Sequence, residues 1–137
     1  MSIQIVVDSS VAYKWHYRND EPGVEIADAL LADHLAGSVV LAAPTTLTVE
    51  LANSLRYSGL PPKRVSENID LIGAARIHLF HASTKTLQRA AELAFEHGIS
   101  VYDALFLQLA EHLRCPLYTS DRKAFADIET TVDIRFV

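Results

Sequence analysis

The 137 residues are 50% hydrophobic and 21% charged, which fits one folded domain and excludes a disordered chain. No apolar run approaches the roughly 20 residues that span a bilayer, so we expect no membrane segment. The formal net charge of −5 argues against a simple nucleic-acid binder, because phosphate contacts favour a basic surface.

The first half of the sequence alternates short β-branched runs with stretches of helical spacing. In chain order it predicts a strand over 3–7, a short helix over 9–17, a turn over 19–23, a helix over 24–36, a strand over 39–42 and a helix over 45–58. Ser9 or Ser10 could cap the short helix. Leu47, Leu51 and Leu55 form one apolar stripe on the last of these helices.

The second half continues the alternation of helices and strands. It predicts a helix over 63–75, a weaker strand over 77–82, helices over 84–97 and 101–113, a strand over 116–119, a helical turn over 122–125 and a last strand over 132–136. The helix over 101–113 is apolar on almost every side, which predicts burial. Short strands separated by helices favour an α/β sandwich with a largely parallel sheet.

Four carboxylates stand where the parallel strands would end. Asp8 follows the first strand and Asp121 follows the fourth. Glu50 and Asp103 lie in helices that begin at the same edge, where ligands usually bind in such sheets. Acids without basic partners repel one another unless a cation offsets their charge. Mg²⁺ and Mn²⁺ prefer oxygen ligands, so the pattern predicts a divalent-metal site.

Each acid also has an ordinary structural interpretation. Asp8 and Asp121 could cap the helices that follow them, and Glu50 could be a solvated helix residue. Ser100 and Asp103 match the S-x-x-D capping box, which requires only a helix start. The interpretation as a site therefore depends on the four positions taken together.

Three segments carry a resemblance to a known family: IVVDSSVAYKW, PTTLTVELANSL and HGISVYDALFLQLAEHLRCPLYTSDRKAF. In the order and spacing of these motifs the sequence resembles PIN domains, and in particular the VapC toxins of VapBC toxin–antitoxin pairs. The resemblance covers essentially the whole chain and implies a single PIN domain over 1–137. It implies a PIN-like three-layer α/β/α sandwich with a short, mostly parallel central sheet.

The resemblance also implies an activity. It indicates a Mg²⁺-dependent endoribonuclease that hydrolyses RNA phosphodiester bonds as the toxin of a type II toxin–antitoxin system, with Mn²⁺ as a substitute ion. The family's acidic positions, which would be catalytic and metal-binding, correspond to Asp8, Glu50, Asp103 and Asp121. Its polar companions, which would support the ligands, correspond to Ser10, Asn53 and Thr119.

Partners and location follow from the same resemblance. It implies a cognate antitoxin protein and a homodimer, for which apolar residues within 26–35 and 69–77 could supply an interface or could equally be core. The start of the sequence lacks the positive region of a signal peptide, and the single Cys115 cannot form an internal disulfide. A reducing cytoplasm is therefore the expected location.

Basic side chains would have to meet the RNA despite the net negative charge. The ones on segments that could border the site are Lys14, Arg18, Arg56, Lys63, Arg64, Arg122 and Lys123. We expect some of them to contact the RNA backbone, although each alone could be an ordinary solvated charge.

Two other functions stay open. A catalytically silent PIN-like module could bind RNA or protein without cleaving, but such a module has no need for four intact acids. A phosphoryl-transfer enzyme with an aspartate nucleophile would place a second Asp two residues after Asp8, where this sequence has Ser10.

Overall fold

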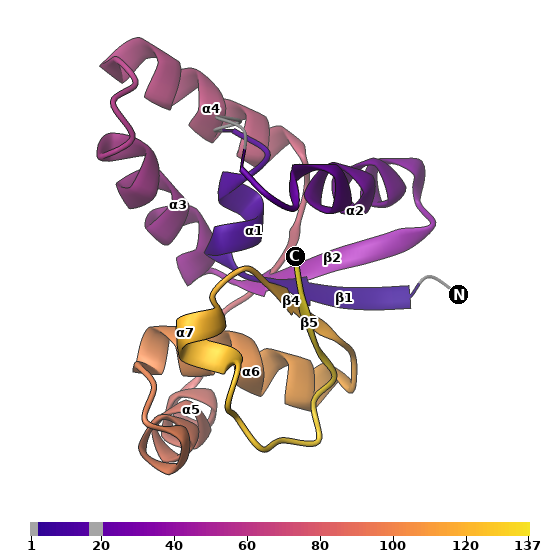
Figure 1. Ribbon diagram of the computed structural model, residues 1–137, viewed down its shortest axis with the longest axis vertical. Helices are drawn as coiled ribbons and strands as arrows, with labels where there is room; N and C mark the ends of the chain where they lie inside the picture. Colours follow the sequence, from indigo (N-terminus) through magenta and orange to yellow (C-terminus); the bar gives the residue numbers. More distant parts are fainter. Residues whose placement is uncertain (1–2, 17–20) are drawn as a thin grey trace.

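The computed structural model describes residues 3–16 and 21–137 (Figure 1). Within these ranges, five strands form one sheet with the order β3-β2-β1-β4-β5. They are β1 (Ile3–Val7), β2 (Val39–Pro44), β3 (His78–Phe80), β4 (Leu117–Thr119) and β5 (Ile134–Phe136). Every neighbouring pair of strands is parallel. This confirms the expected α/β fold with a short parallel sheet.

Helices cover both faces of the sheet and complete three layers. They are α1 (Ser9–Tyr13), α2 (Val24–Ala36), α3 (Thr46–Arg56), α4 (Pro62–Ala74), α5 (Thr84–His97), α6 (Val101–Leu113) and α7 (Arg122–Phe125). The first four lie on one side of the sheet, and α5, α6 and α7 lie on the other (Figure 1). In the ranges described, none of these helices combines the length and the apolar character needed to cross a membrane.

The strand order reverses between β1 and β4. From β1 the chain adds β2 and β3 on one side, and it later adds β4 and β5 on the other. Val7 pairs with Tyr118 across the two strands, and the Asp8 N–H donates to the Tyr118 carbonyl at 3.3 Å. Asp8 and Thr119 therefore leave the sheet side by side. A crevice at such a reversal, beyond the carboxyl ends of the strands, is the usual ligand site of open parallel sheets.

The apolar core fixes the helices that border this edge. Leu47, Leu51 and Leu55 are fully buried, which confirms the predicted stripe of α3. Helix α6 is buried around most of its surface, with Phe106 in its centre, and it contacts β1, β2, β4 and α5. Burying each large side chain contributes about 1.5–3 kcal/mol, so the helix positions are strongly held.

Several boundaries differ from the predictions because side-chain caps and prolines decide them. Helix α1 ends at Tyr13, and residues 17–20 of the predicted helix and turn lie outside the described residues. Asp8, and neither serine, is its cap, since the Asp8 carboxylate accepts the N–H groups of Ser10 and Val11. Helix α4 starts at Pro62, a residue that favours the first helical turn.

The edge strands are shorter than predicted, whereas β2 is longer. Strand β3 pairs only with the last three residues of β2, and β5 pairs only with the three residues of β4. Residues 81–82 lie beyond the end of β2 and residues 132–133 lie before the start of β4, so they have no neighbouring strand to pair with. Strand β2 instead extends to Pro44, which pairs with Phe80 at the strand end.

The apolar faces of α2 and α4 are only partly covered. Ile72 is buried, whereas Ile69 on the same helix is substantially exposed. Leu35 of α2 and Leu71 of α4 are 65% and 62% exposed, and both line an apolar hollow of about 270 Å³. These helices therefore supply core residues on one side and leave an apolar surface on the other.

Candidate active site

Asp8 stands at the centre of the strand-order reversal. It follows β1 directly, and only 5% of its surface is exposed. Its Oδ1 accepts the N–H groups of Ser10 at 3.1 Å and Val11 at 3.2 Å, which makes it the cap of α1. Its Oδ2 accepts the hydroxyl of Thr119. The capping interpretation and the site interpretation are thus compatible, because capping occupies one of the two carboxylate oxygens.

Thr119 and Ser10 join β1 and β4 around this carboxylate. The Thr119 side chain is fully buried, and its Oγ1 also accepts the N–H of Asp121 at 2.9 Å. The Ser10 hydroxyl donates to Asp8 Oδ1 and accepts the N–H of Ser120 at 2.8 Å. The structure therefore places these two predicted companions between Asp8 and the turn that carries Asp121.

Glu50 approaches the same edge from α3. Ser9 donates its hydroxyl hydrogen to Glu50 Oε2, with an oxygen–oxygen distance of 2.8 Å. The other oxygen, Oε1, is buried and has no hydrogen-bond partner among the described residues. Burial, together with the nearby negative charges of Asp103 and Asp8, raises the pKa of Glu50, and the hydrogen bond from Ser9 opposes this shift. Glu50 is thus no ordinary solvated helix residue.

Asp103 and Asp121 stand at the beginnings of two helices. Ser100 Oγ accepts the N–H of Asp103 at 3.0 Å, so the predicted helix start with a Ser100 cap is confirmed. Asp121 Oδ1 accepts the N–H of Ala124 at 3.0 Å and caps α7. As with Asp8, a local structural role does not remove these carboxylates from the strand-end edge.

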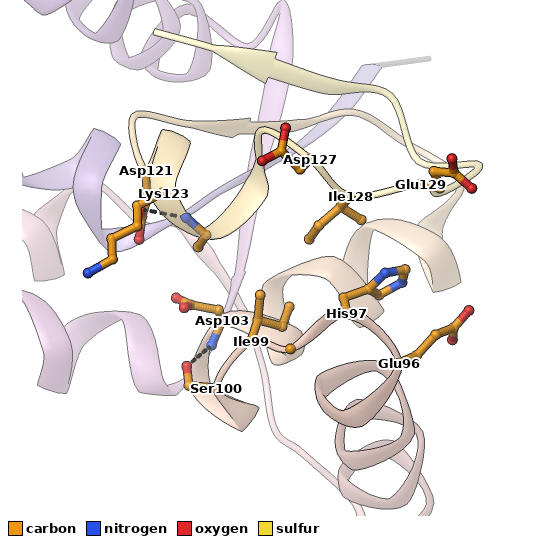
Figure 2. A pocket seen from close by; sticks show the side chains of 12 residues that line it. Glu96, His97, Ile99, Ser100, Asp103, Asp121, Lys123, Asp127, Ile128 and Glu129 are labelled. Carbon is orange, nitrogen blue, oxygen red and sulfur yellow. Dashed lines mark hydrogen bonds between the residues drawn. The ribbon is translucent and has the colours of Figure 1, made fainter.

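An open groove passes between these two helix starts. Figure 2 shows Asp103 and Asp121 on opposite sides of it, with Lys123 next to Asp121. The groove has a volume of about 720 Å³ and continues past the turn between α5 and α6 toward residues 127–129. Two of the predicted acids therefore line this groove, whereas Asp8 is buried and is not part of the groove lining.

Mutual repulsion and burial both disfavour the charged forms of these acids. Burial raises the pKa of Asp8 to about 6, with a further contribution from Asp121, although hydrogen bonds from Ser10, Thr119 and Val11 oppose the shift. Burial and Asp121 also raise the pKa of Asp103, against a hydrogen bond from Ser100. Among the ion pairs formed by the described residues, none includes one of the four acids. The site therefore carries unneutralised negative charge.

The chemistry of this set fits a hard divalent cation. All of its charged ligand atoms are carboxylate oxygens, and the buried Glu50 Oε1 is an acceptor without a donor among the described residues. Side chains of this set lie near enough to raise one another's pKa. They are neighbours and not a closed cage: in ranges 3–16 and 21–137, no three His, Cys, Asp or Glu side chains gather closely enough to hold an ion.

Some predicted residues lie away from this network. Asn53 is on the exposed side of α3 and takes no part in the hydrogen bonds described above. Lys14 is 6% exposed, and its ammonium group donates to the Pro22 carbonyl at 2.7 Å and pairs with Glu21 at 3.3 Å. Lys14 is therefore a buried structural cation that is not available to RNA, and Arg18 lies outside the described residues.

The other predicted basic residues are exposed. Arg122 and Lys123 belong to α7, directly after Asp121, and Lys123 lines the groove. The Arg122 guanidinium lies 5.0 Å from the centre of the Phe136 ring. Arg56 lies 4.9 Å from the ring centre of the adjacent Tyr57, at the far end of α3. Of the predicted cations, the α7 pair is thus closest in the chain to a site carboxylate.

The sequence reasoning missed two features of this site. Ser9 contacts Glu50, yet only the neighbouring Ser10 was assigned a supporting role. The two consecutive serines after Asp8 could have indicated a supporting role for both. Their carboxylate partners lie in different parts of the chain, so the sequence alone did not pair Ser9 with Glu50. Glu96, Asp127 and Glu129 line the continuation of the groove, and no motif distinguishes them from ordinary surface acids.

Comparisons with known proteins identify the family and the fold. The sequence profile described as "PIN domain" matches residues 5–130. A comparison with curated proteins gives no significant match. The fold resembles that of a chain in the VapBC2 complex of Rickettsia felis bound to a promoter DNA fragment, with a TM-score of 0.71 at 16% identity, covering 98% of this chain and 99% of that one.

Two further solved structures share the fold. VapC20 of Mycobacterium tuberculosis, described as a toxin that cleaves the sarcin–ricin loop, gives a TM-score of 0.71 at 16% identity, covering 93% of this chain and 98% of that one. PAE2754 of Pyrobaculum aerophilum gives 0.70 at 20% identity, covering 96% and 83%. At these identities the likeness concerns the fold, whereas the profile match spans most of the sequence. The chain belongs to the PIN domain family.

Proposed function

We propose that this chain is a Mg²⁺-dependent endoribonuclease that hydrolyses RNA phosphodiester bonds and acts as the toxin of a type II toxin–antitoxin pair. The observation that carries the proposal is a set of neighbouring acids beyond the carboxyl ends of the strands. Burial and mutual repulsion raise the pKa of Asp8, Glu50 and Asp103, and Asp103 and Asp121 line an open groove. VapC20, which shares this fold, is described as a cleaving toxin, and this supports the reaction class. Mn²⁺ would substitute for Mg²⁺ because both prefer oxygen ligands.

The residues divide into two proposed roles. Asp8, Asp103 and Asp121 would hold the cation, and Glu50 would help hold it or orient the attacking water. When bound, such an ion makes water more acidic and offsets negative charge on the phosphate oxygens. Thr119 and Ser10 keep the Asp8 carboxylate in place through their hydroxyl groups. Their hydrogen bonds also favour the charged form of Asp8, which is the form that binds a cation.

The groove would receive the RNA next to these carboxylates. Lys123 and Arg122 on α7 are the cations that we expect to contact the RNA backbone beside the site. Arg56, Lys63 and Arg64 are candidates for more distant contacts, since they belong to the end of α3 and the start of α4. Such contacts would fix the RNA in register and leave the choice of sequence to other features.

Two protein partners belong to the proposal. Solved relatives include chains described as part of VapBC complexes and of a toxin–antitoxin complex from Klebsiella pneumoniae, which supports a cognate antitoxin for this chain. We also propose a homodimer. The exposed apolar residues of α2 and α4 offer a surface that one of these partners would cover, because contiguous apolar patches often mark interaction sites.

Cleavage of RNA by the purified chain, free of any antitoxin, tests the proposed function. We expect cleavage of a total RNA pool with Mg²⁺ or Mn²⁺ and none with a chelator. Asp103→Asn should lower the rate by at least about 100-fold, because electrostatic contributions to catalysis are commonly of this size. The variant should keep its fold, since Ser100 caps α6 through the backbone N–H of Asp103.

Asp33→Asn is the matched control for this charge change. Asp33 is exposed near the end of α2, which precedes the amino end of β2 and is therefore at the opposite edge of the sheet. This control should cleave like the unmodified chain. Cleavage that persists in chelator or in Asp103→Asn would contradict the proposal. Metal binding without any cleavage would favour a silent RNA- or protein-binding module instead.

A further inference from the structure

The two oxygens of the Glu50 carboxylate have different surroundings. Oε2 accepts the Ser9 hydroxyl at 2.8 Å, whereas Oε1 is buried without a hydrogen-bond partner among the described residues. A buried acceptor without a donor destabilises the folded protein. Such a cost is expected where the free oxygen binds another ligand. To bind that ligand, the carboxylate has to be kept from rotating away.

The Ser9 hydroxyl is not needed for the local structure of α1. Ser9 is the first residue of this helix, but the cap is Asp8, which accepts the N–H groups of Ser10 and Val11. Serine at a helix start normally bonds to nearby backbone. Here the hydroxyl instead reaches a carboxylate 41 residues away in sequence. The contact therefore joins α1 to α3 and holds the side chain of Glu50.

The two serines after Asp8 hold two different acids. Ser10 donates to Asp8 and accepts the backbone N–H of Ser120, which ties α1 to the end of β4. Ser9 donates to Glu50 on the other side. Because α1 and α3 pack together, a single short helix fixes the separation of the two carboxylates. The arrangement holds acids that would otherwise repel each other.

We propose that Ser9 is a positioning residue: its hydroxyl fixes Glu50 Oε2 and keeps Oε1 directed to the cation site. The inference rests on the proposed nuclease function. It adds Ser9 to the supporting residues, which the resemblance to the family did not include. Hydrogen-bonding partners of metal ligands typically contribute about 10- to 100-fold to metal affinity or activity. Ser9 does not touch substrate in this account and acts only through Glu50.

The test compares Ser9→Ala with Ser9→Thr, which retains a hydroxyl at the same carbon. Binding of Mn²⁺, followed by electron paramagnetic resonance of the free ion, should be about 10-fold weaker or more in Ser9→Ala and near normal in Ser9→Thr. With RNA, Ser9→Ala should lower kcat and leave KM almost unchanged. Ser38→Ala is the control, because the exposed Ser38 precedes β2 at the opposite edge of the sheet.

The outcomes separate this inference from the proposed function. If the unmodified chain binds Mn²⁺ and cleaves RNA but Ser9→Ala does both equally well, the positioning role is overturned and the nuclease function stands. If the unmodified chain does neither, both fail. If Ser9→Ala does not fold, as circular dichroism would reveal, Ser9→Thr decides. If Ser9→Thr then folds normally but binds Mn²⁺ as weakly as Glu50→Gln does, the role of the hydroxyl is overturned.

Discussion

The carboxylate of Asp8 joins a structural role to a chemical one. It caps α1 with one oxygen and accepts Thr119 with the other, yet it is almost fully buried close to other acids. Burial raises its pKa to about 6, so the protein has to accept an ionised carboxylate in a poorly solvated place at neutral pH. A site that is arranged for a cation is expected to carry such a cost when no cation is bound.

This cost predicts how stability depends on pH in the absence of metal. The folded protein holds the Asp8 proton up to about pH 6, whereas the unfolded chain releases it near the ordinary value of 3.8. The stabilising contribution is therefore complete below about pH 4 and is lost as pH rises through 6. The shift corresponds to about 3 kcal/mol, an order-of-magnitude figure. Because the loss is spread between about pH 4 and pH 6, urea unfolding with a chelator at pH 5 and pH 8 should show about half of it.

Asp8→Asn should lose much of this dependence because its amide does not titrate. At pH 8 the variant should have a larger free energy of unfolding than the unmodified chain. This difference should be smaller at pH 5. Raised pKa values at Glu50 and Asp103 act in the same direction in both proteins, so a smaller slope should remain. Parallel stability curves for the two proteins across this range would contradict the account of Asp8.

Single residues were predictable where a motif carries them and unpredictable where their partner is distant. Asp8 and Asp121 could be placed at strand ends because the β-branched runs before them are local signals. Whether they cap helices or hold a ligand could not be decided, and in the structure the caps are real. The Ser9 contact could not be foreseen, since it depends on how α1 packs on α3.

Elements were predicted well where the chain itself marks their ends. Helices α2, α5 and α6 have the predicted bounds, and glycines follow the first two at positions 37 and 98 with positive φ. The carboxyl end of β3 and the start of β5 were overestimated because their neighbours, β2 and β4, offer no further backbone partners there. Such pairing joins residues far apart in sequence, so local composition does not reveal it.

The start of α2 depends on a glycine that the end of the chain covers. Gly23 has φ of +83°, and a Cβ added there would lie 2.6 Å from the Val137 carbonyl carbon. Gly37 has nearly the same φ of +85° but no atom within 4 Å of such a Cβ. Alanine at either position costs about 1–2 kcal/mol through its backbone conformation. Overpacking adds about 1–3 kcal/mol at Gly23 alone.

We therefore expect Gly23→Ala to lower the free energy of unfolding by more than Gly37→Ala does. Chemical unfolding of the two variants beside the unmodified chain measures the difference, and Gly37→Ala serves as the control for the backbone contribution. Equal losses would mean that the chain end at Val137 does not hold the start of α2 as the structure indicates.

For the molecule as a whole, the distribution of charge bears on the conflict between a negative chain and the proposed RNA substrate. The net charge of −5 includes the acids that meet at the strand ends, and a bound cation would offset part of it. Exposed cations on α7 lie directly after one of these acids. The summed charge therefore does not exclude the proposed function, because the distribution of charge decides where a phosphate can approach.

The parallel sheet was predictable in outline, whereas the order of its strands and the exposed faces of α2 and α4 were not. Alternating strands and helices indicate a parallel sheet, and this fold brings the strand-end acids to one edge. The same reasoning could not separate core from interface on α2 and α4, since one helical face can serve both. In the structure, Leu30 and Ile72 are buried while Leu35 and Leu71 remain exposed.

Diffraction from crystals grown with Mn²⁺ tests whether these carboxylates form one cation site. We predict an anomalous peak bordered by Asp8, Asp103 and Asp121, with Glu50 beside it, and the loss of this peak in crystals of Asp103→Asn. Well-ordered carboxylates with no anomalous peak between them at saturating Mn²⁺ would contradict the claim. A peak only elsewhere on the protein would contradict it equally.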